Sequence, residues 1–196
     1  MVRFVIVLLL ASVLVSQTSS PKLEPYEVAE AYEVYAAVIS SQFPYTDSKT
    51  SRLMIRAEIR ASQATSVQMC LAPDESSEEI IGSAIADYVQ QNRQGRLLQR
   101  KFNLEKPYTL FVEDEKTPPI QVSPADPQEF HPVYPEFGGL IELSAVGFNA
   151  DKTIAVVYYQ QLCGTLCGQG EFHVLQKKAG KWQPFPWKGS SCTWFS

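Results

Sequence analysis

The stretch IAVVYYQQLCGTLCGQG, residues 154–170, decides the fold. Its first part, Ile154 to Tyr159, is apolar at consecutive positions, which is typical of a strand in the middle of a sheet with both faces covered. Its second part places Cys163 and Cys167 four residues apart, each followed at once by a glycine. Such a loop is a reactive dithiol, half of a metal site, or a disulfide that closes the end of a strand.

The sequence on both sides of this stretch predicts antiparallel hairpins. Leu140–Phe148 and Thr153–Tyr159 flank the polar turn NADKT, and Phe172–Lys178 and Lys181–Phe185 flank AGK. Short strand patterns on either side of such turn residues are the usual signature of a hairpin. Cys192–Phe195 is a candidate edge strand. The C-terminal third therefore predicts a β-meander.

The N-terminal part has mostly helical patterns. Apolar residues recur at helical spacing from Pro25 to Ser40, and Pro25 suits a first helical turn. Residues 53–60 alternate between apolar and charged side chains, which predicts a half-buried strand. Ser76–Glu79 fits a capping box, and an apolar stripe follows it until Gly95, a plausible helix stop.

The middle of the chain is less regular. Tyr108–Glu113 resembles a short strand, whereas Leu97–Leu104 is either a strand or irregular. Residues 107–135 are proline-rich, which excludes a helix and favours a long surface loop or a hinge. Together the patterns predict an α+β fold, in which N-terminal helices pack on one face of a mainly antiparallel C-terminal β-meander. Residues 21–196 are long enough for one such domain.

The first 20 residues have the composition of a secretory signal peptide. Arg3 precedes the apolar run from Phe4 to Val15, and small polar residues follow it up to Ser20. The apolar run is short for a membrane-spanning helix. Pro21 disfavours cleavage after Ser20, so an uncleaved N-terminal anchor is the alternative, and only then would the chain be held at a membrane. We expect a periplasmic or secreted protein.

The composition limits the possible partners. The net charge is −4 at pH 7, and no basic stripe is present. An acidic chain of this kind argues against nucleic acid and against anionic membrane surfaces as partners. With 45% hydrophobic and 19% charged residues, the chain is globular rather than disordered.

The four cysteines, Cys70, Cys163, Cys167 and Cys192, favour two disulfides in an exported chain, and four cysteines allow three pairings. Cys163 and Cys167 can pair if the loop folds back on itself, because four fully extended residues would hold them about 13 Å apart. Gly164 and Gly168 can supply the backbone angles for that reversal. Cys70–Cys192 then follows by elimination.

Two other chemistries are open to the same loop. Catalytic dithiols usually have the spacing C-x-x-C at a helix N-terminus, whereas this loop has C-x-x-x-C between strands, yet a small disulfide loop can be reducible. A zinc site needs about four ligands, and Cys163, Cys167 and His173 would supply three only if the hairpin brought His173 to the loop. We expect neither a metal nor a cofactor.

The segment IELSAVGFNADKTIAVVYYQQLCGTLCGQGEFHVLQKKAGKW resembles a family of exported bacterial proteins of unknown function. The shared features are a VGFNxD turn, a CGxLCGxG loop and a closing hairpin of the KxGxW kind. The resemblance covers the last third of the chain and, more loosely, its helical part. It implies a bacterial, extracytoplasmic setting, and it assigns no catalytic residue.

The remaining candidate is the aromatic C-terminus, where Trp182, Phe185, Trp187, Trp194 and Phe195 are either core residues or a binding platform. Nucleophile-elbow, zinc-protease and phosphate-loop motifs are absent from the sequence. We therefore expect a non-enzymatic, disulfide-stapled binding or structural domain of the cell envelope, with a protein, peptide or glycan as partner. Its binding surface would combine Trp187 with Gly164, Leu166 and Gly168. The alternative is a thiol-redox or small hydrolytic enzyme that uses Cys163 and Cys167.

Overall fold

The computed structural model describes residues 23–42, 52–61, 67–71, 75–113, 134–164, 167–186 and 192–195. The expected signal peptide, most of the proline-rich loop, Leu166 and Trp187 lie outside these residues. The described part is an α+β fold with helices α1 (Ala29–Gln42), α2 (Val67–Cys70) and α3 (Glu75–Gln91). The predicted fold class is thus confirmed at the α+β level.

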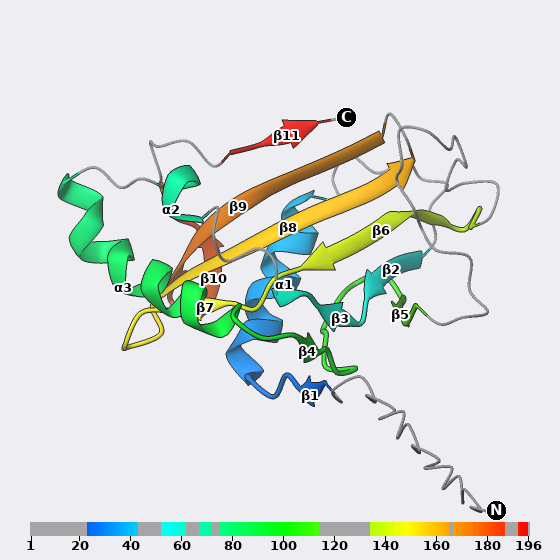
Figure 1. Ribbon diagram of the computed structural model, residues 1–196, viewed down its shortest axis with the longest axis horizontal. Helices are drawn as coiled ribbons and strands as arrows, with labels where there is room; N and C mark the ends of the chain where they lie inside the picture. Colours follow the sequence, from blue (N-terminus) through cyan, green and yellow to red (C-terminus); the bar gives the residue numbers. More distant parts are fainter. Residues whose placement is uncertain are drawn as a thin grey trace, which may run out of the picture.

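The fold is built on a large mixed sheet of eight strands. Its strand order is β10-β9-β8-β6-β2-β5, with β7 paired to β8 and β11 paired to β9. The bounds are β2 Arg52–Arg56, β5 Tyr108–Phe111, β6 Phe137–Leu143, β7 Gly147–Phe148, β8 Ile154–Gly164, β9 Cys167–Lys178, β10 Lys181–Pro184 and β11 Trp194–Phe195. Strands β8, β9 and β10 form the predicted antiparallel meander, and β8 and β9 are long neighbouring strands (Figure 1).

The strands predicted at residues 53–60 and Tyr108–Glu113 are present as β2 and β5, and they join this sheet, which the sequence did not indicate. Strand β2 runs parallel to both β6 and β5, so the sheet is mixed. A separate three-stranded sheet has the order β1-β4-β3, with β1 at Glu24–Pro25, β4 at Arg96–Leu97 and β3 at Glu58–Ile59. The expectation that Pro25 begins a helix is wrong, because Pro25 pairs with Leu97 in this small sheet and α1 begins at Ala29.

The two long helices cover opposite faces of the large sheet, not one face as expected. Helix α1 shares a core cluster with Ala155, Val157 and Leu175, whereas α3 shares one with Val156 and Val174. Successive side chains of a strand point to opposite faces. Because β8 is apolar at odd and even positions alike, each face needs its own helix, and the expected burial of Ile154 to Tyr159 is confirmed in a strand at mid-sheet.

Strand β2 is buried on both faces, although its alternating sequence predicted one exposed face. Leu53 and Ile55 face the α1 cluster, and Met54 packs with Phe111 and Leu140 in a third cluster. Arg56 is also buried, with 3% of its surface exposed. A charged residue in an alternating strand pattern therefore does not indicate a solvent-exposed position here, because a salt bridge compensates its charge.

Helix α3 ends at Gln91, four residues before the glycine that the sequence indicated. Asn92, which is fully buried, donates from Nδ2 to the carbonyls of Tyr88 at 2.9 Å and Ala145 at 3.0 Å. Its Oδ1 accepts from the Ala145 backbone N–H at 2.8 Å. This side chain bonds the end of α3 to the connection between β6 and β7. A tertiary contact, as well as the local sequence, therefore determines where the helix ends.

Candidate functional site

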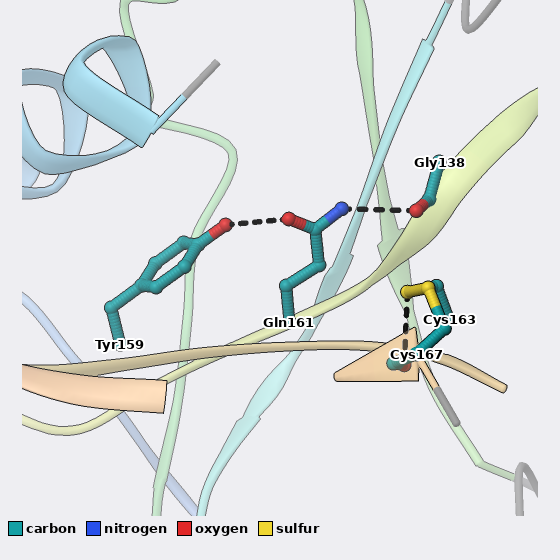
Figure 2. Close-up of a disulfide and its surroundings, with 5 residues drawn as sticks. All are labelled: Gly138, Tyr159, Gln161, Cys163 and Cys167. Atoms are coloured by element: carbon teal, nitrogen blue, oxygen red, sulfur yellow. Dashed lines mark hydrogen bonds between the residues drawn. A yellow bond between two sulfur atoms is a disulfide. The ribbon is translucent and has the colours of Figure 1, made fainter. Parts of the chain in front are cut away.

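The candidate site is the end of the β8–β9 hairpin, which a disulfide closes. Pairing runs from Ile154 opposite Gln176 to Leu162 opposite Gly168, and Gly164 then pairs with Cys167 after a register shift. The disulfide Cys163–Cys167 holds its two Cα atoms 5.0 Å apart. The loop between the strands is therefore covalently fixed at its base (Figure 2).

Only one of the two glycines expected to reverse the chain has an unusual backbone angle. Gly164 has a φ of 149°, in the region that favours glycine, and it is buried. Gly168 lies in β9 without a positive φ and is half-buried. Leu166, the third loop residue proposed for binding, lies outside the described residues. Gly164 thus shapes the loop, and of the two described glycines only Gly168 reaches the surface appreciably.

Hydrogen bonds anchor the closed end of the hairpin to β6. Tyr159 donates from its hydroxyl to Oε1 of Gln161 at 3.1 Å, and Gln161 donates from Nε2 to the Gly138 carbonyl at 2.9 Å (Figure 2). Burial raises the pKa of the Tyr159 phenol, so it stays a neutral donor. A Cβ at Gly139 would lie 3.1 Å from Cβ of Cys163, so β6 also approaches the bridge closely.

The geometry of the bridge does not indicate an activated thiol. Cys163 is half-buried and Cys167 is exposed, and Sγ of Cys163 lies 2.9 Å from the Cys167 carbonyl oxygen. A disulfide sulfur carries no proton, so this is an S···O contact.

His173 is too far along the sheet to complete a metal site at the loop. It pairs with Val157, which precedes Cys163 by six residues, a separation of about 20 Å along a strand. Its Nε2 lies 3.4 Å from Oε1 of Glu171. Burial lowers the pKa of the His173 imidazole, and the Glu171 carboxylate partly opposes that effect. The described residues contain no group of three or more potential metal ligands.

The second disulfide, Cys70–Cys192, joins α2 to the segment before β11, with Cα atoms 5.1 Å apart. Both bridges are those that the sequence analysis expected. Strand β11 also holds β9 and β8 together beside the loop. Its Trp194 pairs with Gly170 of β9 and donates from Nε1 to the Tyr158 hydroxyl of β8 at 2.7 Å. Phe195 is 75% exposed on this edge strand.

A charged network with a buried Arg56–Glu142 pair lies on the same sheet face as Trp194, and the sequence did not reveal it. Arg56 pairs with Glu142 through Nε and with Glu113 through Nη1 at 2.7 Å. Glu142 also accepts from Gln160, which in turn accepts from the Tyr158 hydroxyl at 3.2 Å. The members come from β2, β6, β8 and the residues after β5, so no local pattern could have joined them. Each charge has a partner, which favours a structural role.

The aromatic C-terminus does not form one platform in the described structure. Trp182 is 9% exposed and packs against Phe148 on the α1 side, whereas Phe185 packs against the α3 cluster. Trp194 is half-buried under its hydrogen bond to Tyr158, and Trp187 lies outside the described residues. Phe195 is the large exposed aromatic residue among them.

Comparison of the chain with protein-family models, curated proteins and solved structures finds no match. Among the described residues, no helix is long and apolar enough to span a bilayer. What the fold and the site define is therefore a class: a disulfide-bonded α+β domain with a covalently closed hairpin end.

Proposed function

We propose that the chain is an exported, non-enzymatic domain of the bacterial cell envelope that binds a protein, peptide or glycan partner through the closed end of the β8–β9 hairpin. The observation that carries the proposal is the construction of this end. A disulfide, a buried glycine turn and the Tyr159–Gln161–Gly138 hydrogen bonds fix its shape, while Cys167 and Phe195 present exposed surface beside it. Rigid loops lose little entropy on binding.

The cysteine chemistry supports export. All four cysteines are bridged, and none is free. Disulfides of this kind persist in oxidising compartments and are rare in a reducing cytosol. The family resemblance and the N-terminal sequence support the same setting. The test is a fusion of residues 1–30 to an alkaline phosphatase that lacks its own signal. We expect activity outside the cytoplasm, and we expect Leu8→Arg/Leu9→Arg to abolish it.

The binding surface can be tested by photo-crosslinking in cells of the source organism. A photoreactive phenylalanine analogue at Phe195 should give one discrete adduct, and the same analogue at Lys178, at the other end of β9, should not. Cys163→Ser/Cys167→Ser should reduce the adduct without lowering the amount of protein. Trp187→Ala should reduce it as well, if Trp187 belongs to this surface. Adducts of equal yield from both positions would contradict a specific surface at the hairpin end.

The small disulfide loop with an exposed Cys167 favours one alternative, a thiol-redox enzyme. An insulin-reduction assay separates the two functions. We expect the wild-type chain to match Cys163→Ser/Cys167→Ser, with turbidity developing no faster than with dithiothreitol alone. Faster reduction by the wild type than by the double variant would favour the enzyme.

A further inference from the structure

Strand β11 lies on the outer edge of β9, next to the closed hairpin end (Figure 1). It is two residues long and pairs Trp194 with Gly170 and Phe195 with Gln169. Strand β10 lies on the same edge of β9, but it pairs only with Leu175–Lys178. Among the described strands, β11 alone therefore covers this end of the β9 edge, although the side chain of its second residue is 75% exposed.

A slot on β9 holds the one large side chain that anchors β11. The indole of Trp194 lies over Gly170, where a Cβ would come within 2.3 Å of Nε1 and 2.8 Å of Cε2 of that indole. Nε1 donates to the Tyr158 hydroxyl at 2.7 Å, and the same Cβ would lie 2.5 Å from the hydroxyl oxygen. The slot exists because position 170 is a glycine, and a hydroxyl acceptor lies at its end.

This arrangement is the one by which sheet edges bind extended peptides. In such complexes, backbone pairing supplies affinity and a pocket for alternate side chains supplies specificity. Strand β9 offers both, with a backbone edge at Gln169–Gly170 and the slot above it. The Tyr158 acceptor favours an indole over a phenyl ring, because only the indole has an N–H to donate. Strand β11 thus occupies a strand-acceptor site, which consists of this edge and this slot.

The Cys70–Cys192 bridge joins the segment before β11 to α2 and so keeps β11 at this site. The noncovalent contacts of the segment include the two-residue pairing, the Trp194 indole bond, and a hydrogen bond from Thr193 Oγ1 to Glu171 at 3.2 Å. A covalent connection gives β11 a high effective concentration at its own site, which disfavours any competing strand. Opening the bridge removes this advantage.

The backbone at Cys192 also favours release once the bridge is open. Cys192 is exposed, and its φ of 48° lies in the left-handed region, which non-glycine residues disfavour. The other described non-glycine residues with a positive φ, Lys152 and Ala179, lie in hairpin turns. Cys192 instead lies two residues before Trp194, at a place where the bridge fixes the chain. Such conformations persist only when the surrounding structure imposes them.

We propose that β11 is a redox-controlled strap over the strand-acceptor site on β9. A dithiol reductant opens the bridge when its thiolate attacks Sγ of Cys192, and Cys70 leaves as a thiolate and takes up a proton. The second thiol of the reductant then attacks the mixed disulfide and releases Cys192 as a thiol. The bridge gains two electrons and two protons, and the reductant becomes a disulfide.

With the bridge open, β11 exchanges with an extended peptide of a protein partner, which places a tryptophan over Gly170. The strap stays closed in an oxidising compartment and opens where a dithiol is supplied. This site is distinct from the partner surface proposed at the hairpin end, because that partner binds the oxidised chain with β11 in place. The crosslinking experiment and the experiments below can therefore fail independently.

Disulfide capture tests the acceptor site. The full mature chain carries Cys192→Ser/Trp194→Ala, so that Cys70 is free and the slot is vacant. The probe is acetyl-Cys-Thr-Trp-Phe-Ser-amide, the sequence of residues 192–196, in a glutathione redox buffer, and intact mass spectrometry measures the peptide bound to Cys70. We expect capture at least tenfold above that of the peptide with alanine in place of tryptophan. A phenylalanine peptide, which lacks the indole donor, should be captured about fivefold less than the tryptophan peptide.

Two glycine substitutions in the same chain are the matched controls. Gly170→Ala should reduce capture to the level of the alanine peptide, because its Cβ fills the slot. Gly180→Ala, in the turn at the other end of β9, should leave capture unchanged. If Gly170→Ala does not fold, the comparison of the three peptides decides. Equal capture of the tryptophan and alanine peptides, or full capture by a folded Gly170→Ala chain, would overturn the proposal.

The redox control is tested in Cys163→Ser/Cys167→Ser, where Cys70–Cys192 is the one remaining bridge. The indole ¹⁵N–H signal of Trp194 is followed by NMR while acetyl-Ser-Thr-Trp-Phe-Ser-amide is added. After dithiothreitol we expect the signal to move toward the position of a free indole while far-UV circular dichroism is retained, and before dithiothreitol we expect no change. No movement after reduction, equal movement before it, or loss of the dichroism together with the signal would contradict a strap.

Discussion

Gly147 lies where helix α3 crosses the sheet, and its missing side chain allows the helix to approach. A Cβ at this position would lie 2.2 Å from the Tyr88 backbone nitrogen and 2.4 Å from the Ala84 carbonyl oxygen. Both atoms belong to helix backbone, which cannot move aside as a flexible side chain does. We therefore expect Gly147→Ala to lower the free energy of unfolding by about 3 kcal/mol or more, measured by urea denaturation.

Gly180 in the β9–β10 turn is the matched control for this prediction. Its φ is 76°, but a Cβ there would meet no atom within 4 Å. Gly180→Ala should therefore cost only the strain of a left-handed alanine, about 1 kcal/mol. A cost for Gly180→Ala equal to that of Gly147→Ala would show that close packing of α3 on β7 is not what makes Gly147 necessary.

His173 makes stability depend on pH in the mildly acidic range. Burial lowers the pKa of its imidazole below the ordinary value of 6.5, and the nearby Glu171 carboxylate opposes this effect. The unfolded chain therefore takes up a proton at a higher pH than the folded chain does. The stability that the neutral His173 imidazole gives the folded chain is complete above about pH 6.5. It is lost as the pH falls from there toward the pKa of His173 in the folded chain.

Denaturant midpoints measured from pH 8 to pH 5 test this prediction. We expect His173→Gln to show a smaller loss of stability across this range than the wild type. His131→Gln changes the other histidine of the chain and measures its separate share of the slope. If His173→Gln kept the full slope, the loss would have to come from other groups, and His173 would not be its source.

The two disulfides act on different elements and differ in how much chain they constrain. Cys70 and Cys192 are 122 residues apart, whereas Cys163 and Cys167 are four apart. The loop-entropy model gives about 5 kcal/mol for the long bridge and about 2 kcal/mol for the short one. We expect Cys70→Ser/Cys192→Ser to lose more stability in urea than Cys163→Ser/Cys167→Ser. The opposite order would mean that local anchoring, not chain entropy, sets the value of each bridge.

At the level of elements, the sequence predicted those that depend on local patterns. The β9–β10 hairpin and the β7–β8 pairing are confirmed, because their turn residues and strand patterns are adjacent in the chain. The single strand expected over Leu140–Phe148 is wrong, because β6 ends at Leu143 and β7 covers only Gly147–Phe148. The burial of Arg56 was not predictable, because its partners Glu113 and Glu142 come from segments far along the chain. The end of α3 was misplaced for the same reason, since Asn92 bonds to Ala145.

The candidate site was partly predictable on the same physical grounds. The spacing of Cys163 and Cys167 restricts how the loop can close, so a disulfide at the hairpin end could be expected. The bond from Gln161 to the Gly138 carbonyl, which Tyr159 supports by donating to Gln161, could not, because the whole of β8 lies between β6 and the loop in the sequence.

At the scale of the whole molecule, one sheet couples two apolar layers. Val157 and Tyr159 belong to the α1 layer, and Ile154 and Val156 to the α3 layer, so a single strand serves both cores. Losing either layer would expose one face of β8 to water. We therefore predict one cooperative unfolding transition for the oxidised chain, as in a single domain.

Two tryptophans report the two layers separately. Trp182 belongs to the α1 layer, and Trp194 is bonded to Tyr158, which packs against the α3 layer. Trp187→Phe/Trp194→Phe leaves only the first probe, and Trp182→Phe/Trp187→Phe leaves only the second.

In the oxidised protein, where Cys70–Cys192 holds the segment before β11, both fluorescence probes should give the urea midpoint that circular dichroism gives. Comparing each variant with its own circular dichroism removes the effect of the substitutions on stability. In Cys70→Ser/Cys192→Ser the Trp194 probe should change first, because β11 then loses its covalent connection and keeps only noncovalent contacts, such as its short pairing with β9 and the Trp194–Tyr158 hydrogen bond. Separate midpoints in the oxidised chain would contradict the prediction and would mean that the two layers unfold as independent units.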